Sequence, residues 1–161
     1  MGLEIGPLVM RRSIWIDAKP AEVWPELETF ERMREWYGTG HTLVQYEPFV
    51  GGWVETNAGT DIENHGDGAS QAELRFRGRV IVWEPGREVT FEQDWLGHGW
   101  VAAPLITIRL TELDGGTLVE LMHHGFEALG STAEAAENHA GFEEGWGMRQ
   151  LFALRDRVAS R

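Results

Sequence analysis

Cysteine is absent from all 161 residues of the chain. This excludes disulfide bonds and thiolate chemistry, and it suits a reducing compartment without requiring one. The chain also lacks an apolar run near the roughly 20 residues that a membrane-spanning helix needs, and its first residues lack the basic and apolar regions of a signal peptide. We therefore expect a cytoplasmic protein that does not enter a membrane, folded as one domain over residues 1–161.

Basic residues are few, with 14 Lys and Arg against 26 Asp and Glu, and the formal net charge is -12. Such a charge repels phosphate backbones and anionic lipid surfaces at long range. A local basic stripe at Arg75, Arg77 and Arg79 recurs at every second residue, which is typical of one solvated face of a strand. Neither nucleic acid nor a membrane is an expected partner.

Motifs for nucleotide cofactors and for a serine nucleophile are also missing, since the chain has no phosphate-binding glycine loop and no Gly-x-Ser-x-Gly turn. Residues 58–71 partly resemble a calcium loop, but Ala72 stands where that loop needs a bidentate acid. His139 and Glu143 lie one helical turn apart, yet no HExxH arrangement or acidic triad accompanies them or a second group of imidazoles at His98, His123 and His124. We expect no metal and no cofactor.

What the chain does contain is a strand that leads directly into a helix, followed by long alternating strands and a final helix. The unit Lys19-Pro20-Ala21-Glu22 predicts a helix start, because proline needs no hydrogen-bond partner in a first helical turn. Two short helices then reach Tyr37. The remaining predicted elements are a hairpin of residues 41–47 and 52–57, a loop over 58–71, strands over 73–84, 87–95, 103–112 and 117–126, and a helix from 131 to 159.

This order predicts an α+β fold in which a curved, seven-stranded antiparallel sheet wraps around one long C-terminal helix. Two short helices follow the first strand, which is expected to begin near Leu8 and end near Asp17. Alternation assigns one side of each later strand to the interior. These inward candidates are Leu74, Phe76, Val80 and Val82, then Val89, Phe91, Gln93 and Trp95, then Ile106, Ile108 and Leu110, and then Val119, Leu121 and His123.

The last helix carries two apolar stripes rather than one. Met148, Leu151, Phe152, Leu154 and Val158 form the broader stripe, and Phe142, Trp146 and Ala153 form the narrower one. Three glycines near residues 141–147 weaken the helix there. A bend at these glycines, or the close approach of a ligand, would let both stripes face the interior in succession.

Several segments together resemble the START-like helix-grip (SRPBCC) superfamily over roughly residues 11–158, with most similarity to the branch related to the activator of a heat-shock chaperone ATPase (AHSA-like). The resemblance rests on Asp17-Ala18-Lys19-Pro20-Ala21-Glu22-Val23-Trp24, on Trp36, on Gly51-Gly52, on Gly78-Arg79-Val80 to Glu84-Pro85-Gly86-Arg87, and on Leu121-Met122-His123-His124-Gly125-Phe126. It implies a helix-grip sheet with an apolar pocket, and relatives that include polyketide cyclases and lipid-transfer proteins. The family often has leucines at the places of Gln150 and Ala153, so the pocket-facing register of the helix is not settled by the resemblance.

The candidate ligand-binding residues are aromatic side chains from nearly every predicted element, with two polar groups to orient a ligand. They are Trp36, Tyr37, Trp53, Phe76, Phe91, Gln93, Trp95, Trp100, His123, Phe142 and Trp146. His123 is also the candidate acid–base residue, because strand parity turns it inward while His124 points out. The alternative is a core histidine that a neighbouring group satisfies.

Three functions follow from these expectations. The first is a binding protein without catalytic activity that encloses an apolar, lipid-like or aromatic small molecule. The second is an enzyme of the polyketide cyclase or dehydratase kind that uses His123. The third, implied by the resemblance, is an interaction module that regulates a chaperone ATPase. The sequence leaves homodimerisation open under all three.

Overall fold

The computed structural model describes residues 9–37, 42–57, 75–95, 103–125 and 148–160 of the chain. Four helical segments and eight strands lie in these ranges. In chain order they are β1 (Met10–Ile16), α1 (Pro20–Val23), the 3-10 helix η1 (Trp24–Leu27), α2 (Phe30–Tyr37), β2 (Thr42–Tyr46), β3 (Trp53–Asn57), β4 (Arg75–Glu84), β5 (Glu88–Glu92), β6 (Asp94–Trp95), β7 (Leu105–Leu113), β8 (Gly116–His124) and α4 (Met148–Ala159).

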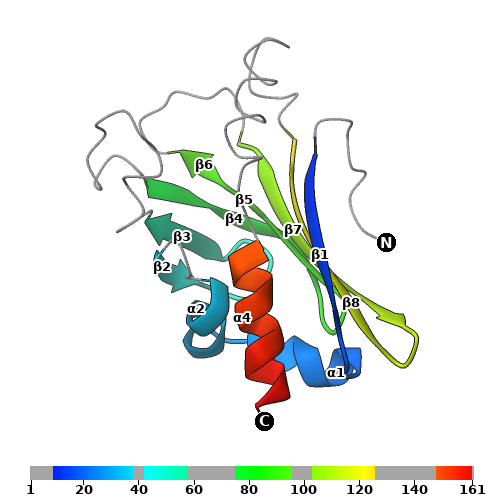
Figure 1. The fold of residues 1–161 in the computed structure, drawn as a ribbon. Helices are drawn as coiled ribbons and strands as arrows, with labels where there is room; N and C mark the ends of the chain where they lie inside the picture. Colours follow the sequence, from blue (N-terminus) through cyan, green and yellow to red (C-terminus); the bar gives the residue numbers. More distant parts are fainter. Residues whose placement is uncertain (1–8, 38–41, 58–74, 96–102, 126–147, 161) are drawn as a thin grey trace.

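The strands pair antiparallel in the order β1-β8-β7-β5-β4-β3-β2, so β1 and β2 are the two open edges of the curved sheet (Figure 1). The strand predicted over 87–95 divides near Gln93. Its first part, β5, pairs with β4 and β7, whereas its second part, β6, pairs with β4 alone. The chains approach closely at this division, because a Cβ atom at Gly78 would collide with the carbonyl oxygen of Glu92.

The helix start predicted at Pro20 is confirmed. The backbone N–H of Lys19 donates to Glu22 Oε1 at 3.1 Å, which satisfies one of the donors that the start of a helix leaves unpaired. The segment then turns through η1 into α2. These helices and α4 lie on one face of the sheet, and α4 packs against α2 and β1 (Figure 1). This is the α+β helix-grip fold that the sequence predicts, with a sheet that does not close.

Glu26 of η1 joins the helical segments to one another. Its side chain is fully buried, and its carboxylate accepts from Arg157 of α4 at 2.6 Å and from Arg32 of α2 at 3.2 Å. Its backbone carbonyl accepts from the Trp36 indole N–H at 3.0 Å. A single glutamate therefore holds α2 and α4 together and fixes Trp36 beneath the sheet.

Most of the predicted inward side chains are buried, but β4 changes face. A register shift between Val80 and Val82 places Val82 beside Thr90, on the face away from the helices. Trp83 takes the inner position instead and lies 5.1 Å from Trp24 between ring centres. The inward prediction for Val82 was therefore wrong, because a bulge adds a residue that strand alternation does not reveal.

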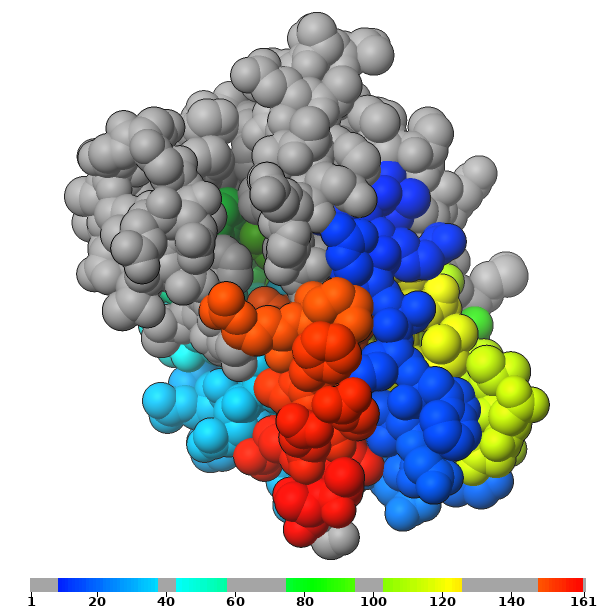
Figure 2. Space-filling model, viewed as in Figure 1, coloured from blue at the N-terminus to red at the C-terminus, as the bar shows by residue number. Residues whose placement is uncertain are grey.

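The described part of α4 presents its broad apolar stripe to the core, with Leu151, Leu154 and Val158 buried. Phe152, which the pattern places on the same stripe, is 45% exposed and contributes nothing to the core. Figure 2 shows α4 in red beside the blue β1–α1 segment on one face of the molecule. The predicted loop over 58–71 and the predicted helical residues 131–147 lie outside the described residues. Among the described helices, none is long and apolar enough to cross a membrane.

Candidate functional site

A row of side chains crosses the inner face of the sheet at the level of His123. The register pairs His123 with Ile106, and Ile106 with Phe91. All three are buried, and His123 has no exposed surface. Neighbouring strands lie about 4.8 Å apart, so the Cα atoms of His123 and Phe91 are separated by about 10 Å, with Ile106 between them. The row forms an apolar floor with an imidazole at one end.

Two aromatic rings from the end of α2 stand at the other end of this row. Tyr37 meets Phe91 edge to face, with ring centres 6.0 Å apart and an interplanar angle of 77°. Trp36 meets Tyr37 in the same way at 5.7 Å and 88°. Such edge-to-face pairs suit the quadrupoles of the rings and give the wall a defined geometry.

Burial raises the pKa of Tyr37 well above the usual value for a phenol. Its hydroxyl is therefore neutral at physiological pH, so it can donate a hydrogen bond but cannot act as a base. Burial also raises the pKa of Tyr46, but the Tyr46 hydroxyl donates to the carbonyl oxygen of Leu27 at 2.7 Å. Tyr46 consequently has a structural role in joining β2 to η1.

Two buried glutamines add amide groups to the interior. Gln93 is 6% exposed and follows Phe91 by two residues on the same face, and its backbone N–H donates to the Pro104 carbonyl at 2.8 Å. Gln150 is 4% exposed in the first turn of α4. Both side chains can donate and accept hydrogen bonds, and neither can take part in acid–base chemistry.

His123 and Gln150 lie toward the same end of the interior. Val158 of α4 and Ile16 of β1 line a common groove. Both elements end toward the lower part of the ribbon in Figure 1, which we call the lower end. Gln150 precedes Val158 by eight residues, which corresponds to about 12 Å along a helix, in the direction of the sheet end that carries Met10 and His123. The lower end carries the buried apolar side chains of Ile16, Leu27 and Val158 together with the buried carboxylate of Glu26.

The structure brings together five of the predicted site residues, namely Trp36, Tyr37, Phe91, Gln93 and His123. Phe76 is buried on the same face of β4, four residues before Val80. Trp53 is not part of this wall. Strand parity puts it on the opposite face, where the guanidinium carbons of Arg77 and Arg79 lie 3.7 and 3.8 Å from its ring centre. The side chain of Trp95 and the residues Trp100, Phe142 and Trp146 lie outside the described part.

Sequence reasoning did not include Gln150 among the site residues. A sequence signal for Gln150 was available, because the family that the chain resembles often has leucines at the places of Gln150 and Ala153. The structure shows that the register is kept, since Gln150 is buried and Ala153 packs against the core. The chain has thus exchanged an apolar side chain for an amide at an inward position.

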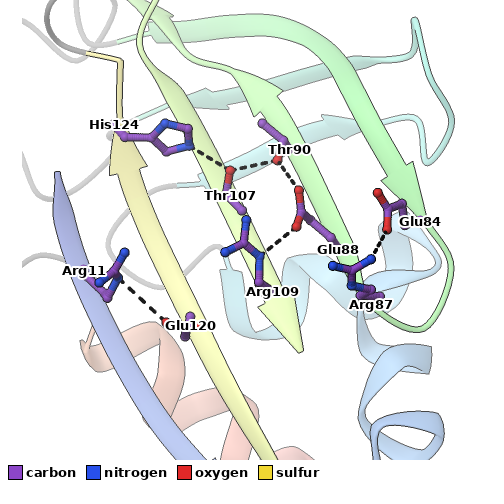
Figure 3. A network of polar contacts seen from close by, with 9 residues as sticks. All are labelled: Arg11, Glu84, Arg87, Glu88, Thr90, Thr107, Arg109, Glu120 and His124. Carbon is purple, nitrogen blue, oxygen red and sulfur yellow. Dashed lines mark hydrogen bonds and ion pairs between the residues drawn. The ribbon is translucent and has the colours of Figure 1, made fainter. Parts of the chain in front are cut away.

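A second set of polar side chains lies on the opposite face of the sheet (Figure 3). His124 Nε2 and the Thr107 hydroxyl are 2.8 Å apart, and the Thr107 and Thr90 hydroxyls are also 2.8 Å apart. The Thr90 hydroxyl lies 3.4 Å from Glu88 Oε2, and Arg109 Nε donates to Glu88 Oε1 at 2.8 Å. These five residues, which we call the outer polar chain, connect β8, β7 and β5.

His124 points away from the inner face as predicted, but it is only 1% exposed. Burial lowers the pKa of His124 to about 4, with a further decrease from the positive charge of Arg109 and an opposing increase from Glu88. The ring is therefore neutral at pH 7 and suited to one acceptor and one donor role. No group of three or more acidic or histidine side chains among the described residues is arranged to hold a metal ion.

Comparison with known proteins places this geometry in a family. A family model described as "Activator of Hsp90 ATPase homolog 1-like protein" matches residues 17–152. No curated protein matches the chain. Protein Ms6760 from Mycobacterium smegmatis is 13% identical with a TM-score of 0.71, and the alignment covers 99% of this chain and 96% of that one.

Two further solved structures show the same fold. The Aha1 dimer from Colwellia psychrerythraea is 15% identical with a TM-score of 0.63, and 93% of this chain aligns with 95% of that one. DynU16, a protein from the dynemicin biosynthetic locus, is 18% identical with a TM-score of 0.63, and 96% of this chain aligns with 48% of that one. Likeness at these identities concerns the fold alone. The family model, in contrast, spans most of the sequence, and the chain therefore belongs to the family of Activator of Hsp90 ATPase homolog 1-like proteins.

Proposed function

We propose that this protein binds an apolar small molecule, lipid-like or aromatic, between the inner face of its sheet and its helices. The observation that carries the proposal is the burial of three polar side chains, His123, Gln93 and Gln150, in an interior that also contains the aromatic rings of Trp36, Tyr37 and Phe91. Small-molecule sites usually combine apolar walls with a few polar groups that fix orientation. Burying three polar side chains costs free energy that a core built for stability alone would avoid.

The register suggests how such a ligand would lie. Its apolar body would rest on Ile106 and Phe91, with the ring of Tyr37 beside it. Its polar group would face His123 or Gln93, which flank this floor from β8 and from the end of β5.

Native mass spectrometry of the purified protein, followed by tryptophan fluorescence titrations with a panel of lipids and aromatic metabolites, tests this proposal. Removing one hydrogen bond to the ligand costs about 1 kcal/mol, so His123→Ala and Gln93→Leu should each weaken binding by about fivefold. Gln45→Leu is the matched control, because Gln45 lies on edge strand β2. Failure of the whole panel to bind, or affinities unchanged in both site variants, would refute the proposal.

A catalytic role for His123 is the second candidate, and its position on the aromatic inner face favours it. An imidazole there could move a proton on a substrate held over Ile106. In an enzyme, His123→Ala should abolish turnover while binding is largely retained, whereas in a carrier it should change affinity alone. Incubation of wild type and variant with any ligand found by the panel, analysed by chromatography, separates the two.

The family description raises a third candidate, regulation of a chaperone ATPase through the protein surface. Stimulation of a chaperone ATPase by the purified protein would support it, and the absence of both stimulation and a stable complex would exclude it. The Aha1 relative from Colwellia psychrerythraea is a dimer, so light scattering on the same sample should record whether this chain also forms homodimers.

A further inference from the structure

The polar side chains of the proposed interior site are groups that carry no charge in mildly alkaline solution. Gln93 and Gln150 are amides, which do not titrate. The hydroxyl of Tyr37 stays protonated, because burial raises the pKa of Tyr37 well above its ordinary value. A histidine such as His123 has an ordinary pKa of about 6.5 and is therefore largely neutral at pH 8. We call these four side chains the inner polar groups.

The permanent positive charges of the chain lie elsewhere. Every Lys and Arg of the sequence except Arg161 falls within the described ranges, and none of those described side chains is buried. Most of them are exposed. Four are half-buried, namely Arg12, Arg77, Arg109 and Arg157. These four decide whether a cation could reach a ligand in the interior.

Two of the half-buried arginines are held by buried carboxylates. Arg157 Nε donates to Glu26 Oε1 at 2.6 Å, where α4 meets η1. Arg109 Nε donates to Glu88 Oε1 at 2.8 Å, and this pair belongs to the outer polar chain on the opposite face of the sheet (Figure 3). Both positive charges are therefore matched by a negative charge at their own position.

The other two half-buried arginines lie at the outer face and at the sheet edge. Arg77 stacks on the outer face against Trp53, and its Nε lies 3.3 Å from Glu55 Oε1. Arg12 is on edge strand β1, two residues after the partner of His123 in the register. Its Nη1 donates to the Arg11 carbonyl at 3.0 Å in a solvent-exposed hydrogen bond. A guanidinium in water compensates a buried anion only weakly.

We infer that the interior site selects a ligand whose polar group is uncharged, such as an alcohol, a ketone or an amide, and rejects carboxylates and phosphates. This inference rests on the function proposed above, because it concerns the same site. A neutral group exchanges its hydrogen bonds with water for bonds to the inner polar groups, whereas an anion would lose its hydration without gaining a counter-charge. The formal net charge of -12 adds repulsion at long range.

Two pairs of probes test the inference, and each pair keeps one apolar body while the charge changes. The pairs are 2-naphthylacetamide with 2-naphthylacetate, and octanamide with octanoate. Equilibrium dialysis against the full chain at pH 8 measures the affinities. In at least one pair the amide should bind, and it should bind at least about tenfold more tightly than its carboxylate.

The pH dependence of the acid gives a second measurement on the same probes. If only the protonated acid enters, its apparent affinity should fall about tenfold for each pH unit above a carboxyl pKa of about 4.3, and thus about 100-fold from pH 6 to pH 8. The matching amide does not titrate. Its affinity over the same range therefore corrects for titration of the protein, including that of His123.

The outcomes separate this inference from the function on which it rests. Equal affinities for amide and carboxylate at pH 8 would overturn the inference and leave small-molecule binding intact. Carboxylate binding at pH 8 that Arg12→Gln abolishes would also overturn it, because the anion would then lie at that guanidinium. If neither amide binds, the proposed function fails and the inference fails with it.

A variant that adds a cation should reverse the preference. Gln150→Lys places an ammonium group where the buried amide lies, so the ratio of carboxylate to amide affinity at pH 8 should rise by at least about tenfold. Gln45→Lys is the matched control, because it adds the same charge opposite Glu55 and should change the ratio by less than about twofold. If Gln150→Lys does not fold, Gln93→Lys takes its place. An unchanged ratio in the folded variant would overturn the inference.

Discussion

Acidification offers a direct test of the outer polar chain. The folded protein keeps His124 neutral, with a pKa of about 4, whereas an unfolded histidine titrates near 6.5. Between these values the unfolded chain binds a proton that the folded protein does not bind. The free energy of unfolding should therefore decrease as the pH falls from about 6.5 toward 4, and the contribution should be fully lost below the folded pKa.

The magnitude follows from the displacement of the pKa. A pKa of about 4 in the folded protein, against 6.5 in the unfolded chain, corresponds to a loss of about 2 kcal/mol in the free energy of unfolding between pH 7 and pH 5. Solvent around Arg109, whose side chain is 23% exposed, screens part of it, so we expect a loss of about 1 to 2 kcal/mol. In a domain of this size that corresponds to a melting temperature lower by about 2 to 8 °C.

The assay is urea unfolding, followed by tryptophan fluorescence, of wild type and His124→Gln at pH 7 and pH 5. Other titrating groups contribute to both proteins, so the difference between the two isolates His124. Wild type should be the more stable at pH 7, because glutamine replaces the His124–Thr107 hydrogen bond imperfectly, and the gap should narrow by about 1 kcal/mol or more at pH 5. A gap that stays constant within about 0.5 kcal/mol would refute the reasoning.

Three further outcomes follow from the packing. Glu26→Gln should lower the free energy of unfolding by about 2 kcal/mol in urea, since it removes a buried charge that two arginines contact, while the exposed control Glu28→Gln should stay within about 0.5 kcal/mol. Gly78→Ala should lower stability by about 2 kcal/mol because its methyl group meets the backbone of Glu92, and an unchanged melting temperature would contradict that contact. Gln150→Leu should fold normally and weaken ligands with a polar head by about fivefold in fluorescence titrations, and an unchanged affinity would remove Gln150 from the site.

The fold was largely predictable because its signals are local. Alternation located the long strands, and the proline of the first helical turn located the start of α1. The division of the 87–95 strand was not predictable in this way. It coincides with the contact of Gly78 with Glu92, and this contact, like the bulge in β4 between Val80 and Val82, arises only when the two strands meet. The same bulge exchanged Val82 for Trp83 on the inner face.

The site was predictable in part. Period-two alternation correctly separated His123 from His124, because neighbouring residues of a strand must face opposite sides. Alternation does not say what covers each side, so it could not show that His124, Thr107 and Thr90 are all buried on the outer face. Trp53 was assigned to the wall on its aromatic character, and register alone decides that it stacks with arginines instead.

Glu26 shows most clearly what local sequence cannot reveal. Glu26 and Glu28 stand two residues apart in the same acidic segment, and no pattern distinguishes them. One is fully buried and the other is exposed, because only Glu26 points toward the place where Arg157, 131 residues away in sequence, arrives on α4. That ion pair joins η1 to α4, which packs against α2 and β1. The burial of Glu26 thus depends on a contact between residues far apart in the chain, which only the folded structure identifies.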